Sequence, residues 1–130
     1  MAPIAGILPC APTASISDVA VAFGLSDSAD CYREIDALEA ARVLEYVLHR
    51  DLAYNVEIMP LGLAIELTAE FIAQFSGLSA RFFTNGDWGR PLLTQGIGHR
   101  WSPVTTATFD AGVVVVSTEK IGCVWCLDED

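Results

Sequence analysis

The chain has 130 residues, of which 52% are hydrophobic and 18% are charged, and its formal net charge is −10 at pH 7. A chain of this length forms one domain, and its apolar share excludes extensive disorder. Because an acidic surface repels phosphate groups, nucleic-acid binding is not expected, whereas a basic protein partner would be attracted.

The first 14 residues are expected to form a flexible or extended leader, followed by a single domain over residues 15–130. Pro3, Pro9 and Pro12 interrupt the apolar run of this leader and no basic residue precedes it, a pattern that is not typical of a signal peptide. The sequence contains no stretch of about 18 uninterrupted apolar residues that would span a membrane. We therefore expect a cytoplasmic protein with reduced cysteines and no membrane partner.

Residues 16–23 carry two competing patterns. Ile16, Val19 and Phe23 recur at helical spacing, and a preceding serine could cap a helix. Val19, Val21 and Phe23 also alternate as in a strand. We favour the strand, followed by a loop over residues 26–30.

The same segment resembles a DNA-binding motif. The sequence Ile-Ser-Asp-Val-Ala-x-x-x-Gly-Leu-Ser, which begins at Ile16, is similar to the helix-turn-helix of lactose-repressor-type regulators, with Gly24 at the turn. The resemblance implies a second, DNA-reading helix. That helix would carry Asp27, Asp30 and Glu34, whose charges repel phosphate, so we expect no nucleic-acid partner.

Two helices are predicted in the middle of the chain. The first covers residues 36–52, because Asp36 and Glu39 form a helix-start signal and leucines then recur along one face. The second covers residues 60–75 and begins at Pro60, a residue favoured in the first turn. Since its polar side is only one residue wide, we expect this second helix to be nearly buried.

Most of the predicted strands follow these helices. Residues 80–84 form a short strand that ends at the turn signal Asn85-Gly86, and residues 113–127 form an antiparallel hairpin. This order predicts an α+β fold in which two principal helices pack on a small, mainly antiparallel sheet.

The segment 85–103 is the strongest candidate for a functional loop, because long irregular loops often bind ligands. It gathers acidic, imidazole, guanidinium and indole groups: Asp87, Trp88, Arg90, His99, Arg100 and Trp101. His99 or Asp87 could act as a catalytic base, while the two arginines would bind an anionic group and the two tryptophans would line a pocket. In the structural alternative, the tryptophans pack the loop onto the sheet and the arginines pair with acids.

Cys123 and Cys126 have the spacing of a redox or metal-binding pair. They lie in a predicted strand, however, where positions three apart point to opposite faces. The remaining cysteines and histidines provide no matching second pair of ligands. We therefore expect these two cysteines to be buried in the core, with no metal and no cofactor.

The chain is similar in style to small acidic proteins of bacterial mobile gene cassettes and to toxin-immunity proteins. No motif is shared, so no residue role follows from this similarity. The charge and the apolar share predict a binding module rather than an enzyme, which either self-associates into a homo-oligomer or docks a basic protein partner. The alternative is a small enzyme or ligand-binding protein that uses the 85–103 loop.

Overall fold

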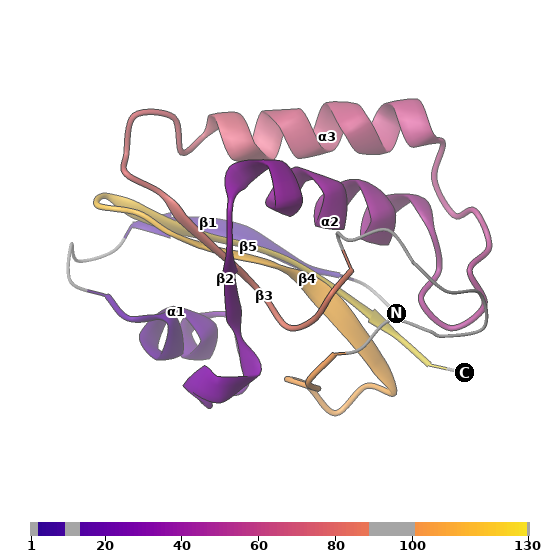
Figure 1. The fold of residues 1–130 in the computed structure, drawn as a ribbon, viewed down its shortest axis with the longest axis horizontal. Helices are drawn as coiled ribbons and strands as arrows, with labels where there is room; N and C mark the ends of the chain where they lie inside the picture. The colour runs from indigo at the N-terminus through magenta and orange to yellow at the C-terminus, as the bar shows by residue number, and fades with distance from the viewer. Residues whose placement is uncertain (1–2, 10–13, 89–100, 130) are drawn as a thin grey trace.

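The computed structural model describes residues 3–9, 14–88 and 101–129, which form a five-stranded antiparallel sheet with helices on both faces (Figure 1). The strands are β1 (Ile4–Pro9), β2 (Arg33–Ile35), β3 (Arg81–Thr84), β4 (Phe109–Val116) and β5 (Lys120–Asp128), in the spatial order β1-β5-β4-β3-β2. The helices are α1 (Ile16–Ala22), α2 (Ala37–His49) and α3 (Leu61–Ala73), and a 3₁₀ turn over Ala29–Cys31 precedes β2. The predicted α+β class is confirmed.

Strands β4 and β5 form the centre of the sheet. The hairpin predicted over residues 113–127 is confirmed and extends further at its open end, where Phe109 pairs with Asp128. Every residue of β4 after Phe109 is buried. Gly112 is required in this strand, because a Cβ atom there would lie 2.1 Å from the carbonyl oxygen of Val124.

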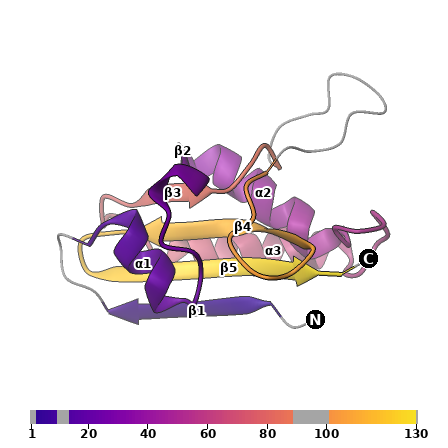
Figure 2. The same cartoon turned by 90° about the horizontal axis from the view of Figure 1, so that it is seen from below.

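The sheet has a hydrophobic core on each face, since successive strand residues point in opposite directions. Val113 and Val115 belong to the core beneath α2, whereas Val114 and Val116 belong to the core beneath α1. Figure 2 shows α1 on the face opposite to α2 and α3. Burial of both faces accounts for the unusually apolar composition of the chain.

Helix α2 begins where the sequence predicts. The Asp36 side chain caps it, with Oδ1 accepting a hydrogen bond from the Glu39 amide at 2.7 Å. One side of the helix is buried in the core on the α2 face of the sheet through Ala40, Val43, Leu44 and Val47. The helix ends at His49, three residues before the predicted end, because the chain turns back there and the Asp51 amide donates to the Val56 carbonyl at 2.9 Å.

The preference for a strand over residues 16–23 is wrong, because this segment forms α1. Ser15 and Asp18 make a reciprocal capping box, in which each side chain accepts a hydrogen bond from the other residue's amide, at 3.1 and 3.2 Å. Val19 and Ala20 are adjacent in sequence and both buried, which suits a helix that packs on a sheet but not an alternating strand.

The resemblance to a helix-turn-helix does not extend to the structure. Gly24 has a positive φ of 78° just after α1. Over residues 25–35, which are all described, the chain forms the 3₁₀ turn and β2 in place of a second helix. The next helix is α2, on the other face of the sheet.

The prediction that the second helix is nearly buried is wrong. Within α3 only Ala64 and Thr68 are buried. Between 38% and 48% of each large aliphatic residue in its first two turns is exposed: Leu61, Leu63, Ile65 and Leu67. Helix α3 packs on α2 and lies farther from the sheet (Figure 1), which it approaches at its C-terminal end, where the Phe75 ring covers Gly122.

Residues 4–9 of the expected leader are extended and belong to the sheet. They form β1, an edge strand that pairs with β5 in antiparallel register, with Ile4 opposite Trp125. The opposite edge is the three-residue strand β2, for which the sequence showed no clear pattern.

Candidate functional site

Half of the predicted site residues belong to the described part of the chain. Arg90, His99 and Arg100 lie outside the described residues. Asp87 and Trp101 line an open hollow of about 350 Å³, together with residues of the 3₁₀ turn and β2. Trp88 does not line this hollow; it is 4% exposed and belongs to the core beneath α2. The catalytic and ligand-binding roles of all six residues stay predictions.

The two tryptophans join both ends of the loop to the domain. The Trp88 ring stacks on Tyr46 and lies against Trp101, with centroid separations of 6.4 and 5.2 Å. Trp101 then stacks on Phe109, with centroids 5.5 Å apart. The Trp88 Nε1 atom donates to Asn85 Oδ1 at 3.0 Å. The indoles therefore pack the two ends of the loop onto the domain, which is the structural role proposed as the alternative to lining a pocket.

A buried carboxylate, Asp110, holds this region together, and sequence reasoning missed it. Its oxygens accept hydrogen bonds from Asn85 Nδ2 at 2.8 Å, Trp125 Nε1 at 3.1 Å and the Val104 amide at 3.1 Å. The amide and hydroxyl of Thr105 also donate to it, at 3.2 and 3.1 Å. Because Asp110 is fully buried and occupied by these donors, it acts as a structural anchor. An acid near the start of a strand that continues as a run of valines, from which Ala111 and Gly112 separate it, is the signal that could have identified it.

The polar groups around the hollow are also engaged within the chain. Arg33 Nη2 lies 2.7 Å from both Glu39 Oε2 and the Gly86 carbonyl oxygen. The Tyr32 hydroxyl donates to the Ser26 carbonyl at 2.6 Å, and burial raises its pKa well above the ordinary value. These contacts engage the side chains of Arg33 and Tyr32 within the chain.

The two C-terminal cysteines lie on opposite faces of the sheet, as predicted. Cys123 belongs to the core beneath α1, whereas Cys126 packs against the core beneath α2. Burial raises the pKa of each thiol to about 12, so both are protonated at neutral pH. Within the described ranges, no group of three or more histidine, cysteine and acidic side chains is arranged to bind a metal ion.

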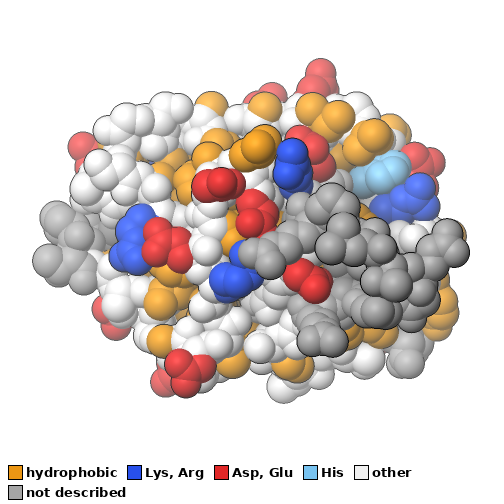
Figure 3. All heavy atoms as spheres, viewed as in Figure 1, with side chains coloured by type: hydrophobic (Ala, Val, Ile, Leu, Met, Phe, Trp, Pro, Cys, Tyr) orange, Lys and Arg blue, Asp and Glu red, His pale blue; other side chains and the backbone are white. Residues whose placement is uncertain are grey.

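An apolar groove between α2 and α3, with a volume of about 490 Å³, is a second candidate site. We call it the α2–α3 groove, and Figure 3 shows hydrophobic side chains gathered over these two helices. Among the described residues that line it, Glu45 is the one with a charge. Small alanines and two exposed aliphatic side chains make up most of the remainder: Ala37, Leu38, Ala41, Ile65, Ala69 and Ala73.

Comparisons of the chain with models of protein families, with curated proteins and with solved structures find no match. None of the described helices is long and apolar enough to cross a membrane.

Proposed function

We propose that this chain is a binding module that self-associates through the α2–α3 groove. The observation that carries the proposal is the exposure of large aliphatic side chains around the groove. Leu38 is 61% exposed and Ile65 is 45% exposed, on the two helices that form its walls. Apolar side chains gathered around a groove in this way mark interaction sites.

The exposed apolar residues concentrate in this layer of the fold. Of the eleven exposed large hydrophobic residues in the described ranges, seven lie between Tyr54 and Leu67, in the loop before α3 and in its first two turns. A stable interface needs roughly 800 Å² from each partner. The groove and the exposed side chains of α3 beside it, Leu61, Leu63 and Leu67, provide apolar side chains from which such an interface could be built.

A second copy of the chain is the partner that fits the charge of the groove. Two copies with a net charge of −10 each repel one another over most of their surfaces. The groove is a place where they can meet, since Glu45 is the one charged residue in the part of its lining that the structure describes. A two-fold contact would place Leu38 and Ile65 of each copy against the small alanines of the other.

Ile65→Glu tests this proposal by sedimentation equilibrium over a range of protein concentrations. We expect the unmodified chain to dimerise and the variant to associate at least about tenfold more weakly, because a carboxylate would be buried in the contact. Val21→Glu is the matched control: Val21 is 57% exposed on α1, on the opposite face of the sheet. A monomeric unmodified chain, or equal weakening by both variants, contradicts the proposal.

A basic protein partner is the second candidate, favoured by the net charge of −10. Such docking would weaken steeply with added salt.

A reducing cytoplasm is the location we propose for either role, and it suits the free thiols of Cys31, Cys123 and Cys126.

A further inference from the structure

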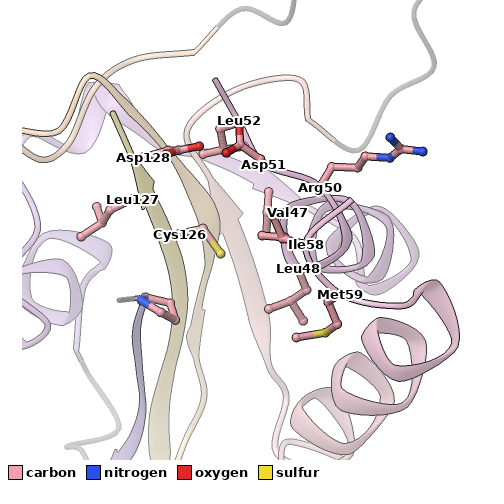
Figure 4. Close-up of a pocket in the computed structure, with 11 residues that line it drawn as sticks. Val47, Leu48, Arg50, Asp51, Leu52, Ile58, Met59, Cys126, Leu127 and Asp128 are labelled. Atoms are coloured by element: carbon pink, nitrogen blue, oxygen red, sulfur yellow. The ribbon is translucent and has the colours of Figure 1, made fainter. Parts of the chain in front are cut away.

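A separate pocket of about 300 Å³ lies at the end of the sheet, between the C-terminal half of α2, the loop that follows it and the end of β5 (Figure 4). Its walls are mainly apolar: Val47, Leu48, Leu52, Ile58, Met59 and Cys126. The Cys126 sulfur points into the space between β5 and α2, whereas the Leu127 side chain points away from it. The volume is at the lower end of the range for small-molecule sites.

Two carboxylates, Asp51 and Asp128, lie together at one end of this pocket, 77 positions apart in the sequence. Figure 4 shows their carboxyl groups directed toward each other. Asp51 Oδ1 accepts a hydrogen bond from the Tyr54 amide at 2.6 Å. Asp128 Oδ2 accepts one from the Ala53 amide at 3.1 Å. The backbone of one loop therefore holds both acids in place.

Asp128 is held in its ionised form. Burial of its carboxyl group opposes ionisation, but hydrogen bonds from the backbone amides of Ala53, Glu129 and Leu52 favour the charged form and lower its pKa. None of the ion pairs between described residues involves Asp51 or Asp128.

One basic residue, Arg50, also lines the pocket, but its guanidinium is engaged away from the two acids. Arg50 donates from Nη1 to the Asn55 carbonyl at 2.9 Å, and Figure 4 shows its side chain extending away from the two acids. His49 Nδ1 lies 2.7 Å from the Met59 carbonyl oxygen and 3.7 Å from Glu57 Oε1. These contacts shape the loop over residues 50–58 and leave the paired carboxylates facing the pocket.

We propose that this pocket binds a small organic cation, an alkyl- or arylammonium ion whose apolar part enters the cavity and whose ammonium group donates hydrogen bonds to the carboxyl oxygens of Asp51 and Asp128. An ammonium group donates up to three hydrogen bonds and would neutralise charge that the chain leaves uncompensated there. The net charge of −10 attracts cations to the molecule as a whole. None of the described residues lines both this pocket and the α2–α3 groove, so ligand binding and self-association can fail independently.

The proposal is tested on the ¹⁵N-labelled full chain by titration with hexylammonium chloride, 1-hexanol and hexanoate, followed by amide NMR shifts. We expect hexylammonium to bind saturably and to shift the amides of Ala53, Met59 and Cys126. We expect 1-hexanol to bind at least about tenfold more weakly and hexanoate not to bind. Equal affinities for the amine and the alcohol, shifts confined to other residues or no saturable binding would overturn the proposal.

A double variant, Asp51→Asn with Asp128→Asn, keeps an oxygen acceptor at each position and removes both charges. We expect its affinity for hexylammonium to fall at least about tenfold, to the level of 1-hexanol. The control with the same change in net charge is Asp27→Asn with Glu119→Gln, two exposed acids outside the pocket. An equal loss in both double variants contradicts the site. If the first variant does not fold, the three-ligand comparison on the unmodified chain decides.

Discussion

Asp110 is the residue whose hydrogen bonds connect the segments at the two ends of the 85–103 loop to the sheet. Its carboxylate receives hydrogen bonds from Asn85, Val104, Thr105 and Trp125 while fully buried. Removing one partner from a buried polar network leaves the other partners unsatisfied, which costs more than the net contribution of the bonds themselves.

We expect Asp110→Asn to lower the free energy of unfolding by about 3 kcal/mol, since the new amide NH₂ group would face several donors that it cannot accept from. Urea denaturation followed by tryptophan fluorescence measures the change. Asp27→Asn, at an exposed position, serves as the control and should change the stability by less than about 0.5 kcal/mol. Similar stabilities for the two variants would show that the network is not critical.

The thiol of Cys123 makes the free energy of unfolding depend on pH in the alkaline range. Burial raises its pKa from 9.0 to about 12 in the folded chain, so the unfolded chain loses this proton first as the pH rises. The unfolded state then binds fewer protons than the folded state, and the stabilising contribution is lost between about pH 9 and pH 12. We expect Cys123→Ala to show a shallower loss of stability across this range. Parallel slopes for the variant and the unmodified chain in urea titrations would contradict this expectation.

At the scale of the element, α1 shows how a local signal decides between two patterns. Val19, Val21 and Phe23 fit a strand, but Ser15 and Asp18 make a capping box that begins a helix. The two periodicities were equally compatible with the apolar residues, so the cap was the more informative feature.

We therefore expect Ser15→Ala to destabilise the chain by about 1 kcal/mol, because an amide at the start of α1 would lose its side-chain acceptor. Ser15→Asp should restore most of the loss, since aspartate is an equally good cap. Thermal unfolding of the three proteins measures the effect. If the aspartate variant is no more stable than the alanine variant, capping is not the source of the stability.

Helix α3 shows the opposite case, in which the pattern was clear and its interpretation was wrong. An almost wholly apolar helix is normally buried. In this fold α2 packs directly on one face of the sheet. Helix α3 packs mainly on α2, with Ala64 and Thr68 buried. The exposed side chains, among them Leu63 and Ile65, are the basis for proposing that a second copy covers this layer.

At the scale of the whole molecule, the net charge of −10 would make the proposed self-association depend on salt in a way that distinguishes the two proposed partners. Added salt screens the repulsion between two acidic copies, so dimerisation through the α2–α3 groove should strengthen between ~0.05 and ~0.5 M NaCl. Sedimentation equilibrium at both NaCl concentrations, on the unmodified chain and on Ile65→Glu, measures this change in dimerisation. Weaker association at high salt would instead favour acid–base contacts.

The sequence by itself determined the elements with strong local signals. It predicted α2 from the cap at Asp36, α3 from Pro60, the hairpin of β4 and β5, and the opposite orientation of Cys123 and Cys126. These features depend on residues close together in the chain, where capping and periodicity act directly.

Only the tertiary structure decided which apolar residues remain exposed and which polar residues meet. Asp51 and Asp128 come together because the loop after α2 lies beside the end of β5, and no local pattern relates positions so far apart. The walls of the α2–α3 groove likewise come from two helices whose packing no single segment specifies. The chain's periodicity gives the apolar face of each element, but the order in which the elements stack determines what covers that face.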